Sequence, residues 1–261
     1  MSLIITAIAR KGGSGKSSTA LNLCGAHLDA DGGEVLLIDL DPQATLSKSL
    51  LGPEVVRQLR PHQTVQAVAE RTKAAGDIVM QTGIPGLLLL PSSPDLQVPA
   101  DAVLNLAGID APLVVIDTPP DTRDHATRCA LLSSNAAISP TVPEPWGIQS
   151  VGEVQTLLMG AGIISNEHLI FTGFLISMMQ RAGIHAVCES TLRRLHGSQV
   201  YDAVVQHAVV FKEATAAGQP VTHYAPKSGG AKVARQVYQE TCERIETALK
   251  RGAAWCRRYN T

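Results

Sequence analysis

Aromatic residues and long apolar runs are scarce in this sequence. Only 3% of its 261 residues are aromatic, which argues against the stacking surfaces that bind single-stranded nucleic acid. No apolar run approaches the roughly 18 residues that suggest a membrane helix, and strand-like sequence starts at residue 3. We therefore expect neither a membrane span nor a signal peptide.

Paired cysteines and clustered histidines are lacking as well. The five cysteines are odd in number, widely spaced and never arranged as C-x-x-C. This pattern favours a reducing cytoplasm, with thiols that serve mostly as small core residues. The eight histidines show no ligand spacing, so we expect no metal site built on histidine.

Charge is unevenly distributed along the chain, although the net charge is only −1. Residues 1–180 carry 10 Lys and Arg against 17 Asp and Glu, whereas residues 181–261 carry 12 against 6. Solvated helix faces would account for this excess, and so would an anionic partner that docks on the C-terminal third. Both interpretations stay open at this point.

Short apolar runs at regular intervals predict the strands of a buried sheet. They lie at 3–9, 34–40, 86–93, 112–118, 136–142 and 169–177. Each run is apolar on both faces, as in parallel strands that helices cover on either side. With 45% apolar and 17% charged residues, the chain has the composition of a globular protein with a sizeable core.

The stretches between these runs are long enough for crossover helices, for example 16–31 and 147–160. Near the C-terminus, residues 231–249 predict an amphipathic helix. Its apolar stripe consists of Val233, Val237, Tyr238, Cys242, Ile245 and Leu249. The alternation of strands and helices predicts an α/β fold with one doubly wound, mostly parallel sheet and helices on both faces.

A glycine-rich segment, ARKGGSGKSSTALNL at 9–23, follows the first predicted strand and opens the first predicted helix. Backbone N–H groups in such a turn, together with the helix N-terminus, suit an anion. Gly15, Lys16 and Ser17 complete the phosphate-loop formula G-x-x-x-x-G-K-[ST]. Arg10 stands where the formula has its first glycine, and a second lysine, Lys11, follows it. We therefore expect a nucleotide-binding loop of an unusual type.

Carboxylates follow two of the predicted strands. Asp39 and Asp41 end the run EVLLIDLDPQ, and Asp117 ends LVVIDTPP. Ligands in doubly wound folds bind at the carboxyl ends of the strands, and carboxylates near a phosphate loop hold magnesium, often through water. We expect both strands to flank the strand that precedes the loop and to bring the three carboxylates to the nucleotide.

The sequence resembles the ParA/MinD family of partition and positioning ATPases. Its loop is similar to the deviant Walker A motif K-G-G-x-G-K-[ST]-[ST] of that family. The resemblance continues through VLLIDLDPQA, LLLLPSSPDL, LVVIDTPPD, TVPEPWGIQSV and EATAAGQPVTHYAPKSGGAKVARQVYQE. It implies one ATPase domain over residues 1–261, similar to short ParA proteins without an N-terminal helix-turn-helix domain.

The resemblance assigns roles to individual residues of this chain. The nucleotide-binding residues that it implies are Lys11, Gly12, Gly13, Ser14, Gly15, Lys16, Ser17 and Ser18. Lys16 would contact the β- and γ-phosphates, while Lys11 would reach across a two-fold dimer interface to the phosphates of the other subunit. A cation supplied in trans stabilises the charge on the transferring phosphoryl group. ATP binding and dimerisation are then linked.

The resemblance also implies a magnesium site and a hydrolytic residue. Ser17 would bind Mg²⁺ directly, with Asp117 and Asp39 holding its waters. Asp41 would orient the attacking water. It need not be a strong base, because a loose transition state requires little activation of the nucleophile. The catalytic residues expected are thus Lys11, Lys16 and Asp41. Nitrogenase iron protein has a similar loop, but its cluster needs more cysteines than Cys129 supplies after the central strands.

One segment departs from the family pattern I-P-R-N-x-R. In VVQHAVVFKEA, His207 and Val210 stand at the arginine positions and Ala208 at the asparagine, so adenine recognition and part of a DNA surface stay undetermined. The remaining cationic candidates for DNA binding are Arg193, Arg194, Lys212, Lys227, Lys232 and Arg235.

The implied function is ATP-dependent DNA partition in the cytoplasm, on the nucleoid. An ATP-bound homodimer would bind duplex DNA without sequence preference, and a ParB-like partner on the cargo would stimulate hydrolysis. Two alternatives stay open, namely positioning of a protein cargo and MinD-like positioning at a membrane. The tail ALKRGAAWCRRYNT has a thin apolar face that Gly252 interrupts, so we do not expect a stable membrane anchor.

Overall fold

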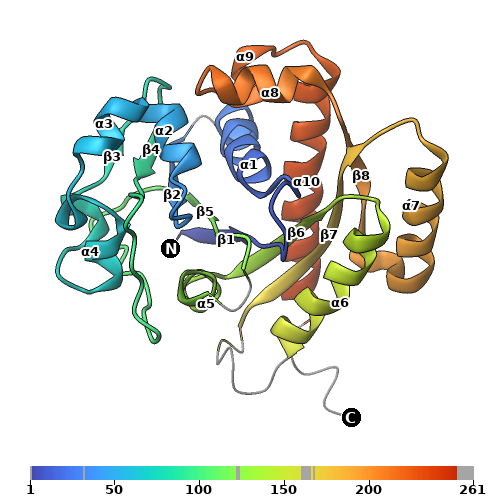
Figure 1. Ribbon diagram of the computed structural model, residues 1–261, viewed down its shortest axis with the longest axis horizontal. Helices are drawn as coiled ribbons and strands as arrows, with labels where there is room; N and C mark the ends of the chain where they lie inside the picture. The colour runs from blue at the N-terminus through green and yellow to red at the C-terminus, as the bar shows by residue number, and fades with distance from the viewer. Residues whose placement is uncertain (1, 32, 122–123, 160–165, 167, 252–261) are drawn as a thin grey trace.

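The computed structural model describes residues 2–31, 33–121, 124–159, 166 and 168–251 (Figure 1). The strands are β1 (Leu3–Ala7), β2 (Val35–Asp39), β3 (Met80–Gln81), β4 (Leu87–Leu90), β5 (Leu113–Asp117), β6 (Ala136–Thr141), β7 (Ile170–Met179) and β8 (Val200–Gln206). They form one sheet in the order β3-β4-β2-β5-β1-β6-β7-β8. β3 runs antiparallel to β4, and the remaining neighbours are parallel.

The helices connect these strands across both faces of the sheet. They are α1 (Lys16–Asp31), α2 (Thr45–Leu51), α3 (Pro53–Gln58), α4 (Val65–Ala69), α5 (His125–Leu132), α6 (Pro145–Met159), α7 (Gly183–His196), α8 (Val209–Ala216), α9 (Val221–Tyr224) and α10 (Gly229–Lys250). Short 3₁₀ turns lie at η1 (Pro61–Gln63), η2 (Ala75–Asp77) and η3 (Gly197–Gln199). Among the described helices, none is both long and apolar enough to cross a bilayer.

Two layers of helices sandwich the sheet (Figure 1). Leu37 of β2 packs in a cluster with α1 and α10, whereas its neighbours Leu36 and Ile38 pack with α4 and α5 on the other face. The helices α6 and α7 cover the second face beside β6 and β7. Because alternate side chains of each strand enter different layers, strands that are apolar on both faces become buried. The expected doubly wound α/β fold is confirmed.

The carboxyl ends of the central strands meet at one edge of the sheet. β1 lies between β5 and β6, and β5 separates β1 from β2. The expectation that β2 flanks β1 was therefore wrong, whereas β5 does flank it. Register still aligns the strand ends, because Asp117 is opposite both Ala7 of β1 and Asp39 of β2.

Two strands were not expected from the sequence. β3 has two residues, and β8 is an edge strand whose side chains are mostly half-buried or exposed. Asp202 interrupts the apolar pattern of β8, so the run lacks the two-sided apolar character used to identify strands. An edge position beside β7 explains how β8 tolerates this sequence, since a sheet edge needs less burial.

The long C-terminal helix α10 confirms the helix expected over 231–249. Val237 and Ile245 of its predicted stripe are buried against the sheet, but Leu249 is 66% exposed. Two small residues of the same helix, Ala234 and Thr241, are buried as well, and α10 contacts α1. The apolar stripe therefore ends before the last turn of α10.

Candidate active site

The loop between β1 and α1 adopts a backbone that depends on glycine. Gly13 has a φ of +78° and Gly15 a φ of +93°, values that L side chains rarely adopt. An added Cβ at Gly12 or Gly13 would meet no atom within 4 Å, so these two residues border open space. The loop then opens α1 at Lys16, which directs unpaired backbone N–H groups toward that space.

β7 holds the loop from the side opposite to β5. The Ser177 hydroxyl donates to the Ser14 carbonyl at 2.6 Å and to the Thr141 carbonyl at 3.3 Å. Met178 follows with a φ of +54°, an uncommon value for a residue other than glycine. Ser177 is the last residue of a predicted strand, at the same sheet edge as the loop, but its bond to the loop was not predicted.

Asp117 ends β5 beside the loop with its carboxylate buried. Both of its oxygens are buried without a hydrogen-bond partner, and so is the Ser14 hydroxyl. Buried polar atoms are nearly always paired in proteins, with protein groups or with ordered water. The unpaired Asp117 carboxylate suits a hydrated cation, and the unpaired Ser14 hydroxyl can donate to an anion.

The electrostatic environment of Asp117 disfavours its charged form. Burial, with the nearby charge of Asp39, raises the pKa of Asp117 to about 8. The Ser17 hydroxyl, which lies near the carboxylate but outside hydrogen-bond geometry, and the Lys16 ammonium partly oppose this rise. A divalent cation at this carboxylate would supply the missing positive charge. Asp117 thus fits the role expected for it.

Asp39 ends β2 and, unlike Asp117, has several hydrogen-bond partners. Its Oδ2 accepts hydrogen bonds from the Ser47 amide at 2.9 Å and hydroxyl at 2.7 Å, and its Oδ1 accepts from the Asp41 amide at 3.1 Å. Burial raises the pKa of Asp39 to about 6 even though these donors oppose it. The carboxylate therefore fixes the start of α2 and the loop that carries Asp41.

Asp41 lies on that loop, half-exposed. Its Oδ1 accepts from the Gln43 amide at 2.9 Å, and the Ser92 hydroxyl donates to its carbonyl at 2.9 Å. Its charge acts on both Lys16 and Asp117. The structure therefore gathers Asp41 with the loop lysine and the β5 carboxylate, and Ser92, which follows β4, is a further supporting residue that was not predicted.

The two loop lysines lie in different environments. Lys16 is 6% exposed, and its burial lowers the pKa of the ammonium although Asp117 and Asp41 counteract this. Lys11 is exposed, with its ammonium 4.1 Å from the centroid of the Trp146 ring. Lys16 thus points into the site and Lys11 lies at its rim.

The residues at this edge fit a nucleotide with magnesium. The loop backbone and Lys16 provide an anion site, and the Ser17 hydroxyl and Asp117 provide oxygen ligands of the kind that Mg²⁺ prefers. Across the described ranges, no three His, Cys, Asp or Glu side chains converge to form a metal site of their own. Mg²⁺ commonly keeps several waters and binds substrate phosphates, so the sparse protein ligand set is consistent with it.

The six candidate DNA-binding cations are not brought together. Arg193 and Arg194 belong to α7 on one face of the sheet. Lys212 of α8, Lys227 and the α10 residues Lys232 and Arg235 belong to the opposite layer (Figure 1). Arg193 pairs with Glu189 at 3.0 Å, and Arg235 pairs with Asp29 at 2.6 Å. The four other cations are exposed and make no side-chain hydrogen bond or ion pair with a described residue.

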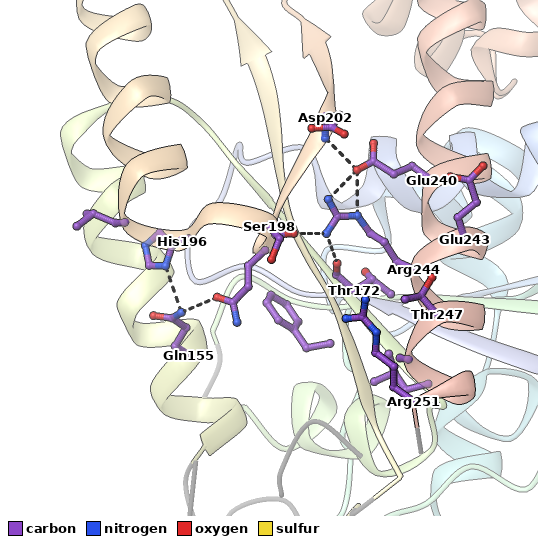
Figure 2. A pocket seen from close by; sticks show the side chains of 15 residues that line it. Gln155, Thr172, His196, Ser198, Asp202, Glu240, Glu243, Arg244, Thr247 and Arg251 are labelled. Atoms are coloured by element: carbon purple, nitrogen blue, oxygen red, sulfur yellow. Dashed lines mark hydrogen bonds and ion pairs between the residues drawn. The ribbon is translucent and has the colours of Figure 1, made fainter. Parts of the chain in front are cut away.

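A cavity of about 750 Å³ lies far from the loop, at the amino ends of β7 and β8. Figure 2 shows its polar wall. The Arg244 guanidinium there donates to the carbonyls of Thr172, Ser198 and Val200 at 2.7–3.0 Å and pairs with Glu240 at 2.7 Å. None of the expected site residues lines this cavity, and its main cation is satisfied by the fold itself. The C-terminal tail, with Gly252 and Trp255, lies outside the described residues.

Comparison with known proteins is consistent with this geometry. A sequence profile described as the CobQ/CobB/MinD/ParA nucleotide binding domain matches residues 5–221. The chromosome-partitioning ATPase Soj of Thermus thermophilus is 29% identical over 251 residues, which cover 92% of this chain and 95% of Soj. The chromosome partitioning protein ParA of Caulobacter vibrioides is 29% identical over 263 residues, or 93% of this chain and 96% of ParA.

A solved structure has a similar fold. Cobyrinic acid a,c-diamide synthase of Mycobacterium smegmatis, with bound ADP and magnesium, superposes with a TM-score of 0.74 at 22% identity. The superposition covers 97% of this chain and 98% of the synthase. At this identity the likeness concerns the fold alone, since one fold serves several functions.

Proposed function

The chain belongs to the CobQ/CobB/MinD/ParA family of nucleotide-binding domains, and we propose that it is an ATPase that partitions DNA. The observation that carries the proposal is the loop with two lysines, beside a buried carboxylate, Asp117, that has no hydrogen-bond partner. An ordinary phosphate loop has one lysine, and the second lysine at the rim distinguishes this loop. The ATPase would act with Mg²⁺ as a homodimer.

Binding of ATP rests on the loop backbone and Lys16. The backbone from Gly12 to Ser18 supplies N–H donors around the open space at Gly12 and Gly13, and Lys16 supplies a buried ammonium. Such donors bind phosphate strongly because they are already oriented toward the position of its charge. The role of Lys16 is thus to neutralise phosphate charge.

The metal-binding residues that we propose are Ser17, Asp117 and Asp39. Bound Mg²⁺ would neutralise phosphate charge and orient the terminal phosphate. Asp117 has unpaired oxygens for this role. Asp39 already accepts three hydrogen bonds, so we assign it a contribution through water and through the position of Asp41.

Hydrolysis requires a water molecule in line with the bond that breaks. Asp41 is anchored at its amide by Asp39 and at its carbonyl by Ser92, which leaves one carboxylate oxygen, Oδ2, to orient that water. A positioned carboxylate serves this role without being a strong base. Lys11, at the rim, would reach the phosphates bound to the other subunit and stabilise charge in trans.

DNA binding is proposed for the surface formed by α8, α9 and the start of α10. Lys212, Lys227 and Lys232 lie on this surface, exposed and without ion pairs to other described residues. A dimer would double the number of phosphate contacts, so affinity should depend on nucleotide state. A ParB-like protein on the cargo would then trigger hydrolysis and release.

The experiment measures binding to duplex DNA of unrelated sequences with ATP, with ADP and without nucleotide, across a salt series. Vesicles of anionic lipid serve as the competing surface. Tight, salt-sensitive DNA binding with ATP alone is expected. Vesicle binding without DNA binding would favour membrane positioning instead. An ATP-dependent dimer that binds neither DNA nor vesicles would contradict the proposed DNA surface.

A further inference from the structure

Arg10, which departs from the ordinary phosphate-loop formula, and Lys11, the second lysine of the loop, both contact α6. The Lys11 ammonium lies 4.1 Å from the centroid of the Trp146 ring, and Arg10 pairs with Glu153 at 3.3 Å. Trp146 is the second residue of α6 and Glu153 lies two turns further along. The start of the loop is therefore tied to α6 by two cations, one on an aromatic ring and one on a carboxylate.

The Trp146 ring is held in place by polar groups. Its indole N–H donates to the carboxylate of Glu144, and the other Glu144 oxygen lies 3.8 Å from Nε2 of the buried His185. Nδ1 of His185 accepts a hydrogen bond from the Gln180 amide, so the neutral ring carries its proton on Nε2, facing Glu144. These contacts fix the edge of the indole and leave a face to Lys11.

We propose that Trp146 is a positioning residue that holds Lys11 on its own subunit, and that formation of the ATP-bound dimer exchanges this contact for one with the other subunit. The inference rests on the proposed role of Lys11 in trans. Glu144 takes part by orienting the indole. The Glu144–Trp146 pair thus sets how readily Lys11 becomes available, and hence how much ATP is needed to form the dimer.

The contact between Lys11 and the Trp146 ring is weak enough to be exchanged for a contact with phosphate. A lysine over an aromatic face at an exposed site gains little compared with an ammonium that meets phosphate charge. Gly12 and Gly13 follow Lys11 directly and have no neighbours at the position of a Cβ, so the local backbone offers no steric obstacle to movement of the side chain. Lys11 can therefore leave the ring when a stronger anion becomes available.

Simple packing does not account for this arrangement. Trp146 is half-buried, and its N–H edge and one face meet charged groups from Glu144 and Lys11. A packed tryptophan also pairs its N–H when it is buried, so the ammonium over the ring face is the feature that packing leaves unexplained. A leucine would keep a smaller apolar side chain at this position but could hold neither contact, and this difference provides the test.

The contact itself can be measured without nucleotide. In a Trp255→Phe background, Trp146 is the sole tryptophan, and a nearby ammonium lowers indole emission. Lys11→Met should therefore raise the emission of Trp146. Lys73→Met should not, because Lys73 is an exposed lysine that follows α4, which packs beside β2 and β4 and not beside α6. Equal emission from both variants would overturn the cis contact whether or not the protein hydrolyses ATP.

The exchange is tested by adding a slowly hydrolysed ATP analogue to the same background. Emission should rise as the dimer forms, followed in parallel by light scattering, and should not rise in Lys11→Met. A dimer that forms with no change in Trp146 emission would overturn the exchange. A protein that shows the cis contact but binds no nucleotide would instead refute the proposed function, so the two failures are distinguishable.

Substitutions at the ring supply the second readout. Trp146→Leu should lower the analogue concentration at half-dimerisation by about two- to five-fold, the factor that corresponds to an exposed cation–π contact. Trp146→Phe retains an aromatic face and should restore most of the wild-type midpoint. A midpoint that shifts equally in both variants, or toward higher concentration in Trp146→Leu, would overturn the role of the ring.

Discussion

The nucleotide end of the sheet and the C-terminal third of the chain treat their charged groups in opposite ways. At the carboxyl ends of the central strands, Asp117 is buried without a hydrogen-bond partner, and burial lowers the pKa of Lys16. In the C-terminal third, Arg193, Arg235 and Arg244 each pair with a carboxylate of the fold. The first region has buried polar groups without partners, as a ligand site does. The second uses several of its arginines to stabilise the fold.

Arg244 shows how far this pairing goes. Its guanidinium donates to three backbone carbonyls and pairs with Glu240 (Figure 2). It also lies 4.4 Å from the centroid of the Tyr201 ring. Arg193 and Arg235 are engaged in a similar way, with a carboxylate and a backbone carbonyl each. The count of 12 Lys and Arg in residues 181–261 therefore overstates the number of cations that are available to a partner.

The largest effect that we expect concerns Lys16. Lys16→Ala should weaken ATP binding by about 100-fold, because a buried ammonium that meets phosphate is lost. The folded state should not be destabilised, since a poorly solvated charge disappears with it. Nucleotide binding by calorimetry and unfolding in urea test both statements, with the exposed Lys73→Ala as the control. Wild-type ATP affinity in Lys16→Ala would contradict the assignment of the site.

Asp41 should affect turnover rather than binding. Asp41→Ala should retain ATP and lose about 100-fold in hydrolysis, because the loss of orientation of a reacting group has a cost in this range. Asp41→Asn keeps an oxygen that can accept from the Gln43 amide, as Oδ1 does at 2.9 Å, and controls for the loop. Phosphate release and nucleotide binding are measured on both variants. Wild-type hydrolysis in Asp41→Ala would exclude this residue from catalysis.

Substitution of Arg244 should lower stability and leave ATP binding unchanged, which is the opposite of what we expect for Lys16. Arg244→Ala should lower the free energy of unfolding by about 2–3 kcal/mol, since several charge-assisted hydrogen bonds are lost and Glu240 is left without its partner. The Lys250–Glu246 pair, on the same helix, is exposed, so Lys250→Ala should change stability by less than about 1 kcal/mol. Urea unfolding measures both. A loss of ATP affinity in folded Arg244→Ala, with unchanged stability, would reverse the comparison between the two regions.

The sequence was most informative where local patterns determine the structure. The first helix was expected over 16–31, and α1 spans Lys16–Asp31, because the G-K-S ending of the loop fixes where the helix begins. The residues at the carboxyl ends of β2 and β5 were also found from their position after apolar runs. Both signals depend on a few consecutive residues.

Contacts between distant segments could not be predicted. Ser177 to Ser14, Lys11 to Trp146 and Arg235 to Asp29 each join segments more than a hundred residues apart, and no local pattern specifies them. The edge strand β8 was missed for a related reason, since Asp202 breaks its apolar run and its stability comes from pairing with β7. The pairing of Arg193 and Arg235 explains why a charge count suggested a larger basic surface than the fold presents.

The smallest effects concern the proposed DNA surface, where three unpaired lysines are compared with one paired arginine. Each phosphate contact contributes about −0.9 to the slope of log affinity against log salt. Lys212→Ala, Lys227→Ala or Lys232→Ala should therefore each reduce the slope by about one per subunit that loses a contact, with a modest loss of affinity. Arg235→Ala should leave the slope unchanged, because its guanidinium is held by Asp29 and the Pro226 carbonyl, and should lower stability instead. DNA titrations of the ATP-bound protein at several salt concentrations, with urea unfolding beside them, give both quantities. If Arg235→Ala reduced the slope while the three lysine variants did not, a paired arginine would be a DNA contact. The contrast between the two regions would then not hold at the proposed DNA surface.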